Sequence, residues 1–211
     1  MSINVEKEWR FMSDEERVRK DFNMRFPLSV CWDFASKHHK GQWYGSKPYM
    51  YHLKKVSDVA LDCGYTDVSI LMSCLLHDVI EDTEVTYKDV KENFGEEVAE
   101  IVYCVTDELG RNRKERKSKT YKKIYDNPKA IVVKLCDRIS NIYESIMGTE
   151  NYNLRLIKMY LDEHESFVDG IYNEDSLELT QKAWNDYNSV VLQLDYMFTD
   201  INDTLKHIEN E

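Results

Sequence analysis

Apolar residues recur every three or four positions along most of the chain, a spacing that predicts a series of amphipathic α-helices. Residues 70–76 differ because they are almost entirely apolar, which predicts a helix buried on most of its sides. Only seven Gly and three Pro occur among the 211 residues, so little interrupts the helical pattern. The sequence therefore predicts an all-α protein.

Single residues mark where several of these helices begin. Pro27 opens one helix, and Pro128 opens a second strongly patterned one. Asp67 can cap the buried helix, and Thr86 with Asp89 forms a capping-box pattern. Further apolar stripes predict helices over residues 52–61, 98–105, 153–172 and 176–207.

The domain organisation follows from length and from the absence of internal repeats or low-complexity linkers. A chain of 211 residues is long enough to bury a real core as one domain. We expect a single domain over 1–211, a helical bundle with its core over about 27–170 and a helical extension over about 176–207. The extension is apolar enough to be a candidate surface for a homo-oligomer.

Composition excludes several classes of protein. The formal net charge of −11 disfavours binding to nucleic acid or anionic membranes, because both need a basic surface. Five scattered cysteines, mostly in apolar runs, predict reduced and buried thiols rather than disulfides. No long apolar span and no leader-like segment is seen, so we expect a cytoplasmic location.

The buried helix ends in four polar groups, His77, Asp78, Glu81 and Asp82. On a continuous helix Glu81 lies above His77 and Asp82 lies above Asp78. His77 and Asp78 would point about 100° apart, so they could share one ion only with help from other segments. The alternative for this stretch taken alone is a helix end with solvated acids and one satisfied histidine.

Two further segments supply that help. His52 begins one predicted helix, and Asp137 lies on the helix that follows Pro128. Two imidazoles and two carboxylates form a nitrogen and oxygen ligand set that suits a first-row divalent ion. Lys134, Asp137 and Asn141 share one face of an otherwise apolar helix, which is typical of residues that line a cavity.

The motifs and their order resemble the HD superfamily of metal-dependent phosphohydrolases, and most closely the RelA/SpoT-type hydrolase domain with its small alarmone-hydrolase relatives. The motifs extend over about two thirds of the chain. They are His39-Lys40-Gly41-Gln42, Pro48-Tyr49-x-x-His52, Leu76-His77-Asp78-Val79-Ile80-Glu81-Asp82-Thr83, Phe94-Gly95-x-x-Val98, Val105-Thr106-Asp107 and Val133-Lys134-Leu135-Cys136-Asp137-Arg138-x-x-Asn141.

The resemblance implies an enzyme that releases pyrophosphate from the 3′ position of guanosine tetra- or pentaphosphate. It also implies one divalent ion, typically Mn²⁺, held by His52, His77, Asp78 and Asp137. Glu81 and Asp82 would orient or deprotonate the attacking water. We expect the small nucleotide substrate to contact Tyr44, Lys47, Arg113, Lys114, Arg116, Lys134 and Asn141.

Residues 111–123 carry eight basic side chains and one acidic one, in a chain that is otherwise strongly acidic. A charge run is commonly a solvated loop. The functional interpretation is a clamp for a multiply charged phosphate ester.

The loop over residues 42–47 departs from the family, because it lacks the Arg that usually follows the Gly-Gln pair. Adenosine substrates therefore stay open beside guanosine ones. A second hypothesis keeps the metal but changes the substrate to another nucleotide or an NADPH-like phosphomonoester. A third is a nucleotide-binding regulator without turnover, which the complete set of catalytic residues disfavours.

Overall fold

The structure, a computed structural model, describes residues 27–147 and 153–209; for residue 147 and for residues 201–209 it describes the backbone alone. Helices make up most of it, which confirms the predicted all-α class. The single small sheet pairs β1 (Trp43–Tyr44) with β2 (Lys47–Pro48) in an antiparallel hairpin. This hairpin lies inside the segment that the sequence predicts as a loop.

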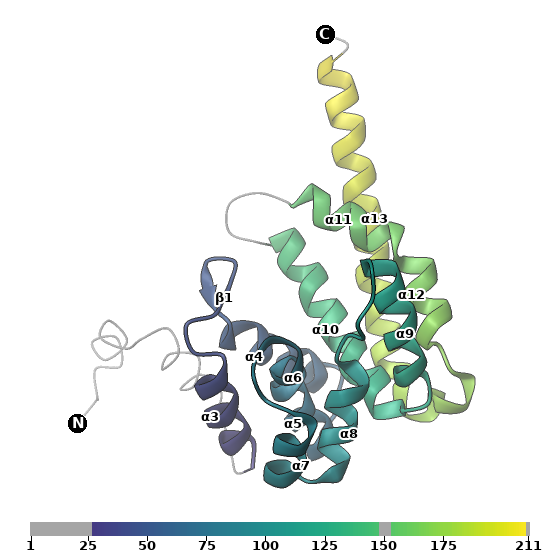
Figure 1. Cartoon of the computed structure of the whole chain (residues 1–211). Coiled ribbons are helices and arrows are strands. Elements are labelled where there is room, and N and C mark those ends of the chain that lie inside the picture. Colours follow the sequence, from purple (N-terminus) through teal and green to yellow (C-terminus); the bar gives the residue numbers. More distant parts are fainter. Residues whose placement is uncertain (1–26, 148–152, 210–211) are drawn as a thin grey trace, which may run out of the picture.

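The first group of helices builds one half of the molecule (Figure 1). It consists of α3 (Leu28–His38), α4 (Met50–Asp62), α5 (Val68–Leu76), α6 (Val79–Asp82), α7 (Tyr87–Phe94) and α8 (Glu96–Val105). The second group consists of α9 (Arg113–Tyr125), α10 (Pro128–Met147), α11 (Leu154–Asp162), α12 (His164–Ile171), the short 3₁₀ turn η1 (Glu174–Ser176) and α13 (Leu177–Glu209).

Helix α5 is the centre of the first group. Every residue from Ser69 to Leu76 is buried, as its nearly unbroken apolar run predicts. It packs against α3, α4, α8 and α10, so neighbours surround it on most sides. Its C-terminal end is buried inside the protein, and the polar residues His77 and Asp78 follow directly from this buried end.

Helix α10 joins the two groups. It packs against α4, α5 and α8 on one side and against α9, α11 and α13 on the other. Helix α13 lies along α10 and then continues past the rest of the molecule (Figure 1). No helix in the described part of the chain has both the length and the apolar character needed to cross a membrane.

The predicted helix starts are confirmed in detail. The Asp67 side chain accepts hydrogen bonds from the backbone N–H groups of Ser69 and Ile70. Thr86 and Asp89 form the complete reciprocal capping box at the start of α7. These caps satisfy N–H groups that the first helical turn leaves without partners.

The structure also differs from the prediction over residues 153–172 and over the basic stretch. The predicted helix over residues 153–172 is divided in two at Glu163, which ends α11 and precedes α12. The basic stretch is helix α9 rather than a solvated loop, and Asn112 caps it by accepting a hydrogen bond from the N–H of Glu115. The loop interpretation failed because a high density of charge does not prevent a helix whose acidic partners lie on neighbouring elements.

Candidate metal centre

Four side chains from three segments meet at the junction of the two groups of helices. His52 comes from α4, Asp137 comes from α10, and the adjacent residues His77 and Asp78 lie between the end of α5 and the start of α6. The ligand atoms of His52, His77 and Asp78 all lie within 4.8 Å of one another. Asp137 joins them from α10, with Oδ1 at 3.4 Å from Nε2 of His52 and 3.7 Å from Nε2 of His77.

A break in the helix brings the adjacent residues His77 and Asp78 together. The prediction of one continuous helix that carries His77, Asp78, Glu81 and Asp82 is wrong. Helix α5 ends at Leu76, and Asp78 has φ −97° and ψ −3°, away from regular helical values. As a result Nε2 of His77 lies 2.9 Å from Oδ2 of Asp78, although a regular helix would point the two side chains apart.

The spacing of the donor atoms fits a single divalent ion. Ligands about 2.1 Å from one ion lie about 3.0 Å apart at a right angle and about 3.4 Å apart at the tetrahedral angle. The two imidazole Nε2 atoms, of His52 and His77, are 3.2 Å apart. His52 Nε2 lies 3.6 Å from Oδ2 of Asp78. The distances between these side chains are therefore compatible with one ion held by the four predicted ligands.

The electrostatics of the centre also favour a cation. Burial lowers the pKa of His77, but the carboxylates of Asp78 and Asp137 outweigh this effect and raise it to about 9. Burial opposes ionisation of both carboxylates, yet nearby cationic groups hold the pKa of Asp78 and of Asp137 below the usual range. The Nδ1–H of His77 donates to the backbone carbonyl of Cys74 at 2.9 Å, which leaves Nε2 to bind a metal ion.

Two residues that the sequence assigned to substrate binding hold Asp137 in place. Lys134 Nζ donates to Oδ2 of Asp137 at 2.9 Å, and the Asn141 side-chain amide donates to Oδ1 at 2.6 Å. Asn141 also accepts a hydrogen bond from the hydroxyl of Tyr44 at 2.7 Å. The structure therefore gives Lys134 and Asn141 defined roles in orienting a predicted metal ligand.

The β1–β2 hairpin covers one side of the centre. The ring of Tyr44 stacks on the imidazole of His52 with centroids 4.6 Å apart. Lys47 lies farther out, where Nζ is 3.3 Å from Oε1 of Glu144 and 3.7 Å from the centroid of the Tyr51 ring. Of the two predicted substrate contacts on the hairpin, Tyr44 lies at the centre and Lys47 is paired beside it.

Glu81 and Asp82 lie on the outer side of the same cluster. Oε2 of Glu81 accepts a hydrogen bond from the N–H of Asp107 at 2.9 Å. Loss of solvation raises the pKa of Glu81, and the carboxylates of Asp107 and Asp78 add to the rise. A carboxylate with a raised pKa is better suited to accept a proton from water than an ordinary one.

The cations of α9 are mostly paired with acids from other segments. Arg113 forms a fork with Glu163, with Nη2 at 3.1 Å from Oε2. Lys117 Nζ donates to Oδ1 of Asp107 at 2.9 Å, and Nε of Arg116 lies 4.0 Å from Oδ2 of the same residue. Asp107 also contacts Glu81. Arg116 and Lys117 are therefore linked to the metal centre through Asp107, and this part of α9 faces the centre.

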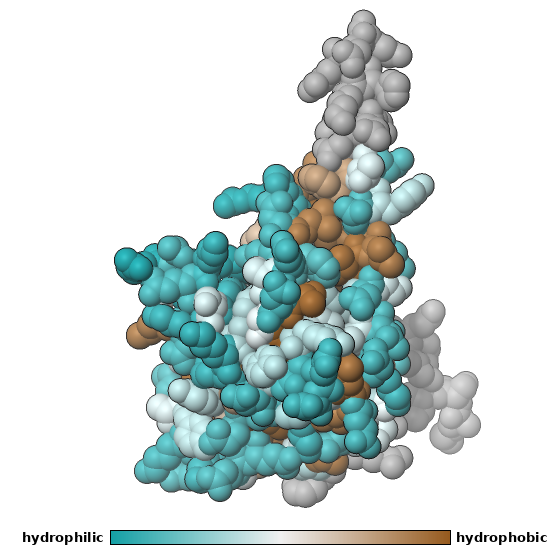
Figure 2. Space-filling model, turned by 90° about the vertical axis from the view of Figure 1, so that its right-hand side faces the viewer, coloured by the Kyte–Doolittle hydropathy of each residue, from teal (hydrophilic) through white to brown (hydrophobic). Residues whose placement is uncertain are grey.

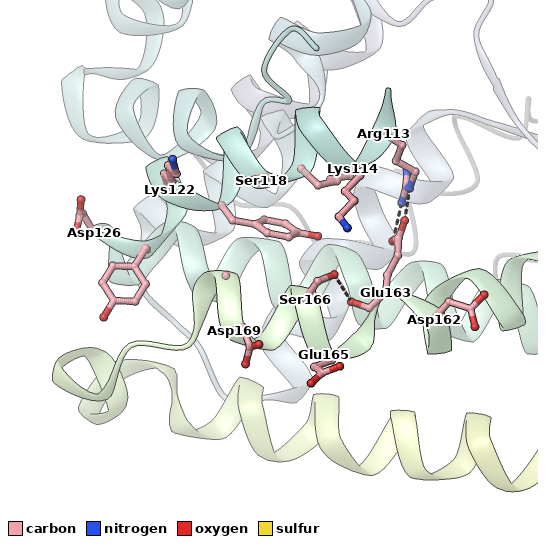
Figure 3. Close-up of a pocket in the computed structure, with 14 residues that line it drawn as sticks. Arg113, Lys114, Ser118, Lys122, Asp126, Asp162, Glu163, Glu165, Ser166 and Asp169 are labelled. Atoms are coloured by element: carbon pink, nitrogen blue, oxygen red, sulfur yellow. Dashed lines mark hydrogen bonds and ion pairs between the residues drawn. The ribbon is translucent and has the colours of Figure 1, made fainter. Parts of the chain in front are cut away.

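A groove of about 1000 Å³ runs between α9 and α12 (Figure 3). Arg113 and Lys114 lie at one end of it, and Glu163 faces them from the start of α12. Among the side chains that the structure describes, none of the four predicted metal ligands lines this groove. Lys114 therefore belongs to the groove rather than to the metal centre.

Two residues that the sequence did not assign to the site contact the carboxylates predicted to be catalytic. Tyr49 contacts both Asp78 and Asp82, and Asp107 holds Glu81. The position of Tyr49 three residues before His52 was the available signal, because that spacing places both on one helical face. Apart from its place in the Val105-Thr106-Asp107 motif, nothing in the sequence indicated that Asp107 contacts Glu81.

The chain is similar to a known family and to solved proteins. The family model described as HD domain matches residues 31–151. The chain is 34% identical over 121 residues to guanosine-3′,5′-bis(diphosphate) 3′-pyrophosphohydrolase of Aquifex aeolicus, a match that takes 54% of this chain but only 17% of that protein. It is 32% identical over 124 residues to the 3′-pyrophosphohydrolase MESH1 of Drosophila melanogaster, covering 56% of this chain and 69% of the relative.

A solved structure has the same fold. It is described as a metazoan ortholog of SpoT that hydrolyses ppGpp and plays a role in starvation responses. The TM-score is 0.67 at 25% sequence identity, and the match covers 81% of this chain and 96% of that one. The shared arrangement thus extends beyond the stretch matched by the family model.

Proposed function

The chain belongs to the HD domain family, and from this premise we propose that it is a metal-dependent hydrolase of nucleotide 3′-pyrophosphates. The substrate would be a guanosine or adenosine tetra- or pentaphosphate, and the product pyrophosphate. The convergence of His52, His77, Asp78 and Asp137 at ion-ligand spacing is the main support. The activities for which these relatives are named support the choice of substrate.

We infer that the ion is Mn²⁺, as the family resemblance implies. When bound, such an ion lowers the pKa of a coordinated water and neutralises charge that develops on phosphoryl oxygens. Glu81 accepts the proton of the attacking water, and Asp82 orients that water. Lys134 and Asn141 keep the Asp137 carboxylate turned toward the two imidazoles.

The experiment is a substrate panel with purified protein and Mn²⁺. Guanosine and adenosine 3′-pyrophosphates should yield pyrophosphate, and Asp78→Ala should yield none. NADPH serves as the competing substrate, because residues 42–47 contain no Arg whose guanidinium could select guanine. Release of orthophosphate from NADPH without pyrophosphate from either nucleotide would replace the proposal with the phosphomonoesterase hypothesis.

We also propose that the first turns of α9 bind the substrate phosphates that lie farthest from the metal. Arg113 and Arg116 are 41% and 39% exposed at their side chains, so a phosphate can reach both despite their acidic partners. Removing both by alanine substitution should raise KM about tenfold at low salt, with a smaller effect at high salt because screening already weakens the wild-type attraction. Lys88→Ala, at an exposed lysine of α7, is the matched control. Equal kinetics of wild type and the double variant at low salt would contradict the clamp.

We infer self-association through α13. Leu192 and Tyr196 are 71% and 75% exposed, and the partly buried Met197 and Phe198 adjoin them. Figure 2 shows apolar atoms gathered along α13 below its grey end. Light scattering should give the mass of a dimer for the wild type and of a monomer for Leu192→Ser/Tyr196→Ser; a monomeric wild type would refute the inference.

We place the protein in the cytoplasm. All five cysteines are buried free thiols, which suits a reducing compartment.

A further inference from the structure

Tyr49 lies between two carboxylates that differ in their proposed roles. Its hydroxyl oxygen is 2.7 Å from Oδ2 of Asp78, a proposed metal ligand. The same oxygen is 2.7 Å from Oδ2 of Asp82, which is proposed to orient water. A hydroxyl has one proton, so its donation is shared between the two carboxylates and ties their positions together.

The ring of Tyr49 is itself fixed from the opposite side. It stacks on the imidazole of His39 with centroids 4.7 Å apart and planes inclined by 14°. The N–H of Tyr49 donates to the carbonyl of Gln42 at 3.1 Å. His39 Nδ1 in turn lies 2.7 Å from Oε1 of Gln42. These contacts therefore hold the ring and the backbone of Tyr49, and with them its hydroxyl, in a defined position.

Gln42, which contacts both His39 and Tyr49, also contacts the backbone of Asp82. Nε2 of Gln42 donates to the Asp82 carbonyl at 2.7 Å. The end of α6 is thus held at two points by residues 39–49, at its carbonyl by Gln42 and at its carboxylate by Tyr49. Both contacts span more than 30 positions of the sequence.

Helix α6 depends on such contacts because it is too short to be rigid by itself. It has four residues, Val79–Asp82, and the N–H of Asp82 donates to the carbonyl of Asp78 at 2.9 Å. An isolated helical turn is not stable in water. The direction of the Asp82 carboxylate must therefore be set from outside the helix.

We propose that Tyr49 is a positioning residue that fixes the Asp82 carboxylate relative to Asp78. This role rests on the proposed hydrolase function, in which Asp82 orients the attacking water. In this proposal Tyr49 acts through Asp82 rather than on the substrate or the attacking water.

The test is Tyr49→Phe, which keeps the ring and its stack on His39 but removes the hydroxyl. Hydrolysis of bis(4-nitrophenyl) phosphate with Mn²⁺ reports on water attack whichever nucleotide is the natural substrate. Measured at saturating Mn²⁺, a misplaced orienting group should lower kcat about 10- to 100-fold, while KM stays within about twofold. Tyr172→Phe, which removes the hydroxyl of a distant half-exposed tyrosine, is the control and should match wild type.

A double-mutant cycle with Asp82→Asn shows whether Tyr49 acts through that residue. In the Asp82→Asn background, Tyr49→Phe should lower kcat no further, because the group it positions is already lost. A second readout is the urea midpoint of metal-free protein, where the shifts of the two variants should not add. This readout needs no activity, so it separates failure of the positioning role from failure of the proposed hydrolase function. Additive effects in both measurements, or a Tyr49→Phe variant with unchanged kcat, would overturn the proposal.

Discussion

Metal-free protein should lose stability as the pH rises from about 6.5 to 10, and His77 should account for much of the loss. The side chain is 2% exposed, and the carboxylates beside it outweigh burial to raise its pKa from 6.5 to about 9. A group whose pKa is raised by folding stabilises the folded state fully below its unfolded pKa. That contribution is lost as the pH rises through the folded pKa.

The size of the effect follows from the shift. A rise from 6.5 to about 9 corresponds to about 3 kcal/mol, since one pKa unit is about 1.4 kcal/mol.

The assay is urea unfolding in the presence of a chelator at pH 6 and pH 10, with wild type and His77→Asn compared at each pH. Other groups titrate in this range, but their contributions cancel in the difference between the two proteins. Wild type should lose about 2–3 kcal/mol more than the variant. Equal losses would show that the metal-free centre does not hold a charged imidazole.

Metal binding should have the opposite dependence on pH. A metal ligand must be the neutral imidazole, so each Mn²⁺ that binds near pH 7 should displace about one proton from the centre. The affinity should then rise up to about tenfold per pH unit below about pH 9. Calorimetry in two buffers of different ionisation enthalpy counts the protons, and a count of zero would contradict the assignment of His77 as a ligand.

Three further predictions concern catalysis and stability. Glu81→Gln with Asp82→Asn should keep Mn²⁺ affinity but lower turnover by about 10²- to 10⁴-fold; loss of metal from this variant would show a structural pair instead. Gly170→Ala should destabilise by about 1–3 kcal/mol in urea unfolding despite the better helix propensity of Ala, because the new Cβ would lie 2.4 Å from Cδ2 of Tyr121. Asp67→Ala should cost about 1 kcal/mol through loss of its cap on α5, whereas Asp67→Asn should retain most of the stability; equal losses in the two variants would exclude the cap as the cause.

Much of the local structure could be predicted from the order of residues. The apolar spacing predicted the helices, and Asp67, Thr86 and Asp89 marked two of their starts. These features depend on residues no more than four positions apart, so the chemistry of a short segment is enough to determine them. The predicted ligand types also came from short motifs, because each motif carries its own His or Asp.

The geometry of the centre came from packing. The break between α5 and α6 lets His77 and Asp78 converge, and nothing in the residue pattern indicated it. The basic run is a helix whose Arg113 pairs with Glu163, 50 positions later in the sequence. Tyr44 reaches Asn141 across 97 positions, and Tyr49 reaches Asp82 across 33. Such contacts depend on how whole helices pack against one another. The spacing of apolar residues within one segment does not indicate which distant segment it will contact.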